Sequence, residues 1–304
     1  MLGPVLLLGA LELGLRLAGF GYPTQFFLQT RLNDRPVWIE NSRFGWRFFP
    51  RRLARAPRPV VLPVDKAAGT CRIFVFGESA AMGDPEPAYG LPHVLATMLR
   101  GVFPGKPFEV ANVAMTAINS NVLLPIAREC VPRQGDVWVI YMGNNEVVGP
   151  FGAGTVFSAH VRSRALLQAS LALKTTRVGQ WLTDLASGLG RRESLPPTWE
   201  GMEMFLQQQV PQDDPRLAAV YDHFEQNLRD MLAAARRGGV KVIVSTVVSN
   251  LRDCAPFGSR HRPDLSAFDL SAWDQQYQNG HRLVDRGDFA AARGALEQAE
   301  RIDP

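Results

Sequence analysis

The sequence predicts an α/β protein with a doubly wound, three-layer α/β/α parallel sheet. The pattern of apolar segments indicates this fold, and the composition indicates a globular chain. Short, almost continuous apolar runs alternate with longer amphipathic stretches from residue 71 onward. Strands of that kind are buried on both faces, as in a parallel sheet covered by helices. In addition, hydrophobic residues make up 46% and charged residues 20% of the 304 positions. This composition fits a globular protein and excludes a disordered chain or a polytopic membrane protein.

The N-terminal segment, residues 1–20, is apolar except for Glu12 and Arg16. It reaches the length of about 20 residues that a bilayer requires only if both charges are included. A membrane anchor, an interfacial helix and a soluble helix therefore all stay open. We expect residues 1–20 to be helical and to remain outside the core of the sheet domain. The basic residues follow the segment, so the positive-inside rule argues weakly against placing the rest of the chain outside the cytoplasm. Most of these residues, however, lie beyond the window of about 15–20 residues in which that rule operates.

Residues 21–70 form a basic lead-in rich in Pro and Arg. Between Arg31 and Lys66 there are nine Lys or Arg and three acidic residues, and residues 42–52 read SRFGWRFFPRR. Aromatic residues interleaved with Arg stack on nucleic-acid bases or lie on anionic lipid. Alternatively, the segment is extended and packs on a domain, with Arg stems covering apolar surface. No nucleic-acid-binding motif accompanies it, so we predict no nucleic-acid partner.

Four strands are expected, each an apolar run that stops at a polar residue or a glycine. They cover residues 71–76, 108–113, 136–142 and 240–248. We expect the strand order of a flavodoxin-like sheet, in which the first of these strands lies between the second and the third.

Helices are expected between and after these strands, where apolar residues recur at helical spacing. Their ranges are about 89–100, 119–129, 162–189 and 217–237. The last two belong to a helical insertion at about 150–237. Asp214 and Pro215 predict the start of the final helix, and Gly238 with Gly239 predicts its end.

Ligands of parallel sheets bind at the carboxyl ends of the strands. Ser79 follows the first strand, and a serine there is either a nucleophile or a helix cap. Asn145 follows the third strand, where its side-chain N–H donates to a developing oxyanion or caps a turn. Because the two residues come from different strands of one sheet, we expect them to face one pocket.

The motifs around these residues resemble those of the SGNH (GDSL-like) hydrolases. Residues 73–79 read IFVFGES, similar to the Gly-Asp-Ser or Gly-Glu-Ser block after that family's first strand. Residues 141–146 read YMGNNE, similar to the Gly-x-Asn-Asp block after its third strand. The resemblance covers about residues 72–252. It implies that Ser79 is the nucleophile and that the Ser79 N–H and Asn145 contribute to the oxyanion hole.

Two features depart from that family. Ala117 occupies the place of the glycine that supplies another oxyanion-hole N–H, so its contribution requires a backbone conformation that alanine can adopt. The family's terminal Asp-x-x-His is absent, because none of the five histidines has an Asp three residues before it. His261 is the best internal substitute for the base. We expect the chain to lack an effective base for Ser79 and to be truncated before it.

The C-terminal segment, residues 271–304, resembles a single tetratricopeptide repeat of an incomplete array. Its matching positions are Gly280, Gly287-Asp288-Phe289, Ala292, Ala299 and Asp303-Pro304. Since one repeat cannot bury its own apolar face, three or more are usually needed. The combination resembles bacterial membrane-anchored proteins in which such repeats are inserted in an SGNH domain, here expected at residues 71–260.

The resemblance implies a serine esterase acting on an acyl or acetyl ester, incomplete in this chain. It also implies a membrane-anchored protein on the extracytoplasmic side. The alternative is a non-catalytic SGNH-like scaffold that binds a protein partner through its repeats. No cofactor or metal site is predicted, because no dinucleotide, P-loop or metal-ligand spacing fits. The three scattered cysteines, Cys71, Cys130 and Cys254, indicate neither a disulfide framework nor a zinc cluster.

Overall fold

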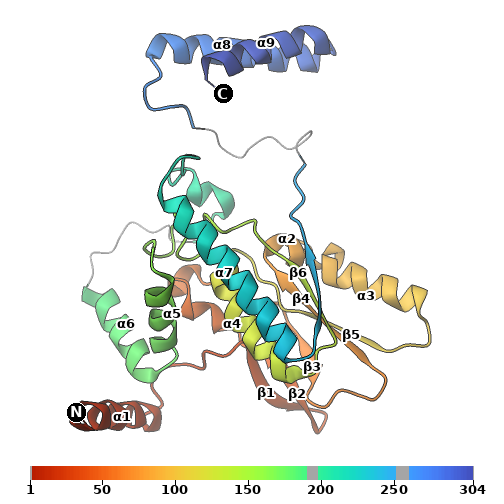
Figure 1. The fold of residues 1–304 in the computed structure, drawn as a ribbon, viewed down its shortest axis with the longest axis vertical. Helices are drawn as coiled ribbons and strands as arrows, with labels where there is room; N and C mark the ends of the chain where they lie inside the picture. Colours follow the sequence, from red (N-terminus) through yellow and green to blue (C-terminus); the bar gives the residue numbers. More distant parts are fainter. Residues whose placement is uncertain (1, 190–197, 251–259, 304) are drawn as a thin grey trace. The chain divides into compact units, whose positions relative to one another are not determined.

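The computed structural model describes residues 2–189, 198–250 and 260–303 (Figure 1). The chain divides into two compact units, Met1–Asn250 and Leu251–Pro304. Cys254 and Pro304, and the end of the predicted resemblance near residue 252, lie outside the described residues.

A parallel four-stranded sheet forms the centre of the first unit. Its strands are β4 (Cys71–Gly77), β5 (Phe108–Asn112), β6 (Val137–Tyr141) and β7 (Lys241–Ser245). The order is β5-β4-β6-β7, and all neighbours are parallel. The predicted position of the first strand between the second and third is confirmed. Phe74, Val75 and Phe76 are fully buried, because β4 is covered on both faces.

Helices cover this sheet, and the first unit is a mixed α/β structure. They are α2 (Ser79–Met82), α3 (Leu91–Val102), α4 (Ser120–Cys130) and α7 (Arg216–Arg237). Short 3-10 turns lie at Pro87–Tyr89 and Val131–Arg133. The helices α4 and α7 lie side by side (Figure 1), and the Asn227 side chain of α7 donates to Ser120 Oγ at 3.0 Å. Gly238 is the C-cap of α7, as predicted.

The helix expected over residues 162–189 is divided in two, and that prediction of one continuous helix is wrong. The structure has α5 (Arg164–Leu173) and α6 (Arg177–Leu189). The hydroxyl groups of Thr175 and Thr176 donate to the carbonyl oxygens of Ala172 and Leu173, at 2.7 and 2.8 Å. Threonine side chains that bond to nearby carbonyl groups compete with the helix, which explains the break.

The lead-in contains an antiparallel sheet that the sequence did not predict. Its strands are β1 (Phe27–Leu32), β2 (Arg35–Glu40) and β3 (Val61–Pro63), in the order β1-β2-β3. Two 3-10 turns, Phe44–Arg47 and Arg51–Leu53, lie between β2 and β3. Phe44, Phe48 and Phe49 are buried in the main core, which supports the packed alternative for this segment.

The N-terminal segment forms helix α1 (Leu2–Leu17), as predicted. Leu6, Leu7 and Leu11 are exposed, so α1 does not enter the core of the sheet. Within the described residues no helix combines the length and the apolar character needed to cross a bilayer.

The second unit contains a helical hairpin of α8 (Ala267–Asp285) and α9 (Phe289–Ile302). A Cβ atom at Gly280 would lie 2.6 Å from the Leu296 side chain, so a glycine allows the two helices to approach. Asp288 caps α9 by accepting from the N–H of Ala291 at 3.1 Å. The predicted pair of helices is confirmed, whereas their membership of a repeat family stays a prediction.

Candidate active site

One pocket in the first unit collects residues from the ends of three neighbouring strands and from the insertion. Its lining consists of Ser79, Thr116, Ala117, Asn145, Val148, Trp199, Met202 and Phe205. The volume is about 50 Å³. Since one water molecule needs about 10–15 Å³ of such space, the pocket admits a small chemical group rather than a large one. The predicted side chains of Ser79 and Asn145 thus line the same pocket as Ala117.

Ser79 is the first residue of α2, directly after β4. A side chain at Gly77 would collide with the Tyr141 carbonyl and with Ala81, so glycine lets the chain turn closely against β6. Within the described residues neither the hydroxyl nor the N–H of Ser79 makes a hydrogen bond. Both groups are therefore available to a ligand.

Ala117 has a φ of 63°, in the left-handed region that favours glycine. Alanine thus adopts here a backbone conformation that glycine adopts without strain, at a cost of about 1–2 kcal/mol. Its N–H has no hydrogen-bond partner in the described part of the chain. Strain of this kind persists where the surroundings impose it and is common at functional sites.

Asn145 is held in place through both its backbone and its side chain. Its N–H donates to Glu78 Oε2 at 2.9 Å, and its Nδ2 donates to the Ile118 carbonyl at 3.1 Å. A side-chain amide has two N–H donors, so the second remains for a ligand. Asn145 accordingly combines a fixed orientation with one free donor on the pocket wall.

Two buried carboxyl groups lie behind the pocket. Glu78 also accepts from the Gly143 N–H at 3.2 Å, so one carboxyl group joins the segment after β4 to the segment after β6. Glu146 accepts from both the N–H and the hydroxyl of Ser120, each at 2.8 Å. Burial and the nearby Glu146 raise the pKa of Glu78 to about 8, and burial raises the pKa of Glu146 to about 7.

No histidine lines this pocket among the residues that the structure describes. His93 is exposed on α3, and His281 packs against Tyr277 on α8. The other three bond elsewhere: His160 Nδ1 to the Phe151 carbonyl (3.2 Å), His223 Nε2 to the Arg162 carbonyl (3.0 Å), and His261 Nδ1 to Asp303 Oδ2 in the second unit (2.6 Å). Within the described ranges, no three His, Cys, Asp or Glu side chains gather as a metal site.

Several pocket residues were not found from the sequence. Thr116 donates to Asp84 Oδ2 at 3.0 Å and lies beside Ala117 in an irregular segment. Trp199, Met202 and Phe205 come from the insertion, the last two from a 3-10 turn at Gly201–Phe205. These segments have no helical or strand periodicity, and so no pattern indicated that they reach the pocket.

No protein-family model matches the chain, and neither does any curated protein. Among solved structures, the esterase AlinE4, an SGNH-hydrolase family esterase, aligns at 14% identity over 59% of this chain and 77% of that one, with a TM-score of 0.25. Two single-residue mutants of AlinE4 align with the same coverage and TM-score, at 13% and 14% identity.

Proposed function

We propose that the first unit is an SGNH-type serine ester hydrolase with the three-layer α/β/α arrangement of that family. One observation carries the proposal. The free hydroxyl of Ser79, the free N–H of Ala117 and the held amide of Asn145 line a single pocket at the carboxyl ends of neighbouring parallel strands. This supplies a nucleophile and a set of donors for a developing oxyanion, which acyl transfer requires.

In this proposal Ser79 Oγ attacks the carbonyl carbon of an ester, and its proton passes to a base. The negative charge that develops on the carbonyl oxygen is stabilised by the N–H groups of Ser79 and Ala117 and by Asn145 Nδ2. When the tetrahedral intermediate collapses, the alcohol departs with a proton and leaves an acyl-serine. Water then attacks the acyl-serine, which releases the acid and restores Ser79.

The lining also favours a substrate class. Trp199, Met202 and Phe205 contribute apolar lining to the pocket, which has a volume of only about 50 Å³. An acetyl group or another short acyl group fits such a lining, because it removes a small apolar surface from water without leaving a polar group unpaired.

Chemical rescue tests the proposal. Since no histidine lines the pocket in the described residues, the chain by itself should hydrolyse p-nitrophenyl acetate slowly. Added imidazole supplies a base, and general-base catalysis contributes about 10²–10⁴-fold. We expect imidazole to raise the rate of the wild type above that of Ser79→Ala.

The matched control is Ser170→Ala, because Ser170 is an exposed residue of α5 away from the pocket. This variant should behave as the wild type. If Ser79→Ala and the wild type show the same rate at every imidazole concentration, Ser79 is not a nucleophile. Clear turnover that depends on Ser79 without imidazole would instead reveal an internal base.

The absence of a histidine from the pocket, among the residues that the structure describes, also favours a second candidate function. An SGNH-like unit without a base can serve as a scaffold that carries the hairpin of α8 and α9, which would bind a protein partner as part of a repeat array. In that case imidazole rescues nothing, and Asn145→Ala leaves the chain unchanged in every ester assay. The same rescue experiment therefore separates the two functions.

A further inference from the structure

Helix α1 is apolar around its whole circumference. Successive helical residues point about 100° apart, so four in a row cover all directions. Val5, Leu6, Leu7 and Leu8 form such a row, and all four are exposed. The exposed apolar surface continues along the helix at Leu11, Leu13 and Leu17. A helix that faces water on a soluble protein normally carries a single apolar stripe, so α1 requires an apolar medium on every side except where it meets the protein.

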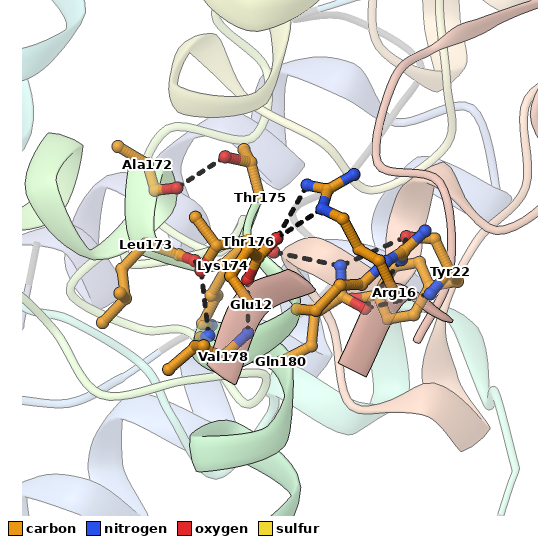
Figure 2. A network of polar contacts seen from close by, with 12 residues as sticks. Glu12, Arg16, Tyr22, Ala172, Leu173, Lys174, Thr175, Thr176, Val178 and Gln180 are labelled. Atoms are coloured by element: carbon orange, nitrogen blue, oxygen red, sulfur yellow. Dashed lines mark hydrogen bonds and ion pairs between the residues drawn. The ribbon is translucent and has the colours of Figure 1, made fainter. Parts of the chain in front are cut away.

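Glu12 makes the polar contact of α1 with the protein, and Arg16 pairs with Glu12 on the same helix, as Figure 2 shows. Glu12 accepts from the N–H of Val178 at 2.9 Å, in the first turn of α6. Arg16 forms an ion pair with Glu12 at 2.7 Å. The Glu12 carboxyl group thus satisfies an N–H that the first turn of a helix leaves unpaired.

The segment after α1 is fixed to the same turn. Gln180 accepts from the Tyr22 N–H at 2.9 Å and donates to the Tyr22 carbonyl at 3.1 Å (Figure 2). The Arg177 guanidinium donates to that carbonyl as well. We call the contacts of Glu12 and Tyr22 with Arg177, Val178 and Gln180 the α1–α6 clamp. It holds both the helix and its exit on the first turn of α6.

Cationic side chains surround the exit of α1. The Arg51 guanidinium lies over the rings of Tyr22 and Trp46, at 5.9 and 5.2 Å, and Arg43 lies over Trp46 at 5.1 Å. Arg51 also pairs with Asp184 at 2.8 Å, with both side chains partly exposed. Aromatic rings and arginines at the end of an apolar helix match the headgroup level of an anionic bilayer.

We propose that α1 is embedded in the hydrocarbon of a lipid bilayer and that the α1–α6 clamp holds the first unit at the headgroup level. A groove on a partner protein would cover only one side of a helix, whereas the exposed apolar side chains of α1 point in all directions. The Glu12–Arg16 pair stays with the protein, because Glu12 accepts from the Val178 N–H of α6. This proposal is independent of esterase activity.

Vesicle co-sedimentation of the 304-residue chain tests the embedded helix. The probes are vesicles of phosphatidylcholine, with and without phosphatidylglycerol. The wild type should bind both, and the anionic vesicles more tightly. Leu6→Asp combined with Leu7→Asp should weaken binding on the order of a thousandfold, since an aspartate in hydrocarbon is strongly unfavourable. Arg43→Gln should weaken only the binding to anionic vesicles, by about fivefold at low salt.

Val102→Asp is the matched control, because Val102 is 66% exposed on α3 and Leu6 is 67% exposed on α1. It should sediment as the wild type does. Equal sedimentation of the double aspartate variant and the wild type, or equal loss for Val102→Asp, would overturn the proposal. The proposal would also be overturned if the wild type does not bind vesicles and instead forms a dimer that the double variant abolishes, since a second copy would then cover α1.

Hydrogen exchange on the vesicle-bound protein tests the clamp. Glu12→Ala removes the acceptor but leaves the apolar surface, so binding should persist while the Val178 amide exchanges roughly tenfold faster. Glu12→Gln keeps an acceptor oxygen and should restore most of the protection. Unchanged exchange at Val178 in Glu12→Ala would show that the clamp does not form on the membrane.

Discussion

The buried Glu78–Glu146 pair predicts that the folded protein loses stability as the pH rises from about 5 to 8. Their pKa values in the folded state are about 8 and about 7, above the ordinary value of 4.5. Between these values the folded protein holds protons that the unfolded chain has released. Stability from these groups is therefore complete below about pH 4.5 and declines as the pH rises through the folded values.

The magnitude follows from the number of protons retained. Each proton that only the folded state holds lowers the free energy of unfolding by about 1.4 kcal/mol per pH unit. Glu146→Gln removes one titrating group and its repulsion of Glu78. The amide oxygen of glutamine still accepts from the Ser120 N–H, so the fold is preserved. We expect the variant to show a slope between pH 5.5 and 7.5 that is shallower by about 1 kcal/mol per pH unit.

Urea unfolding at a series of pH values, followed by circular dichroism, measures both slopes. His223 has a pKa that burial lowers, and it acts in the opposite direction, but it is the same in both proteins and cancels in the comparison. Asp136→Asn is a suitable control, because Asp136 has a lowered pKa and titrates below this range. Identical slopes for the wild type and Glu146→Gln would refute the reasoning.

Three further substitutions are informative. Ala117→Gly should raise stability by up to about 1 kcal/mol, since relief of left-handed strain exceeds the entropy cost of glycine; a loss in thermal unfolding would contradict this. Gly280→Ala should lower the melting temperature of the hairpin, whereas Gly294→Ala, which has open space, should raise it; equal shifts would refute the packing argument. Arg72→Met should lower the free energy of unfolding in urea by about 3–5 kcal/mol, because fully buried Arg72 pairs with Glu109 at 2.6 Å; a decrease below about 1 kcal/mol would contradict this.

The strands of the parallel sheet could be predicted because each is a continuous apolar run. The strand at residues 240–248 was predicted too long, since β7 ends at Ser245. It is an edge strand, and its Ile243 and Val244 are about half exposed. Hydrophobicity alone indicates a buried strand and does not show where pairing stops.

The antiparallel sheet of the lead-in could not be predicted in the same way. Residues of β1 beyond Phe27 and Leu28 are exposed on both faces, so the strand lacks the alternation of a half-buried sheet. Only three residues form β3. The aromatic cluster of the lead-in was recognised as a packed alternative, but its partners in the core depend on contacts far apart in the sequence.

The candidate site was predicted only where a motif marks it. Ser79, Ala117 and Asn145 come from segments that follow apolar strands, and the structure brings them to one pocket. The role of Glu78 as acceptor for two backbone N–H groups was not predicted, because its partners lie 65 and 67 residues away. The pocket wall at Trp199, Met202 and Phe205 follows from tertiary packing and has no sequence pattern of its own.

The Glu78 carboxyl group has a consequence for engineering the pocket. It accepts from the N–H groups of Gly143 and Asn145 and so joins them to the segment that carries Ser79. Under the proposed function, room for a larger acyl group would come from Met202 and Phe205, which line the same pocket from a short 3-10 turn. A library that aims to widen the range of substrates should therefore randomise that turn and leave the buried carboxyl group untouched.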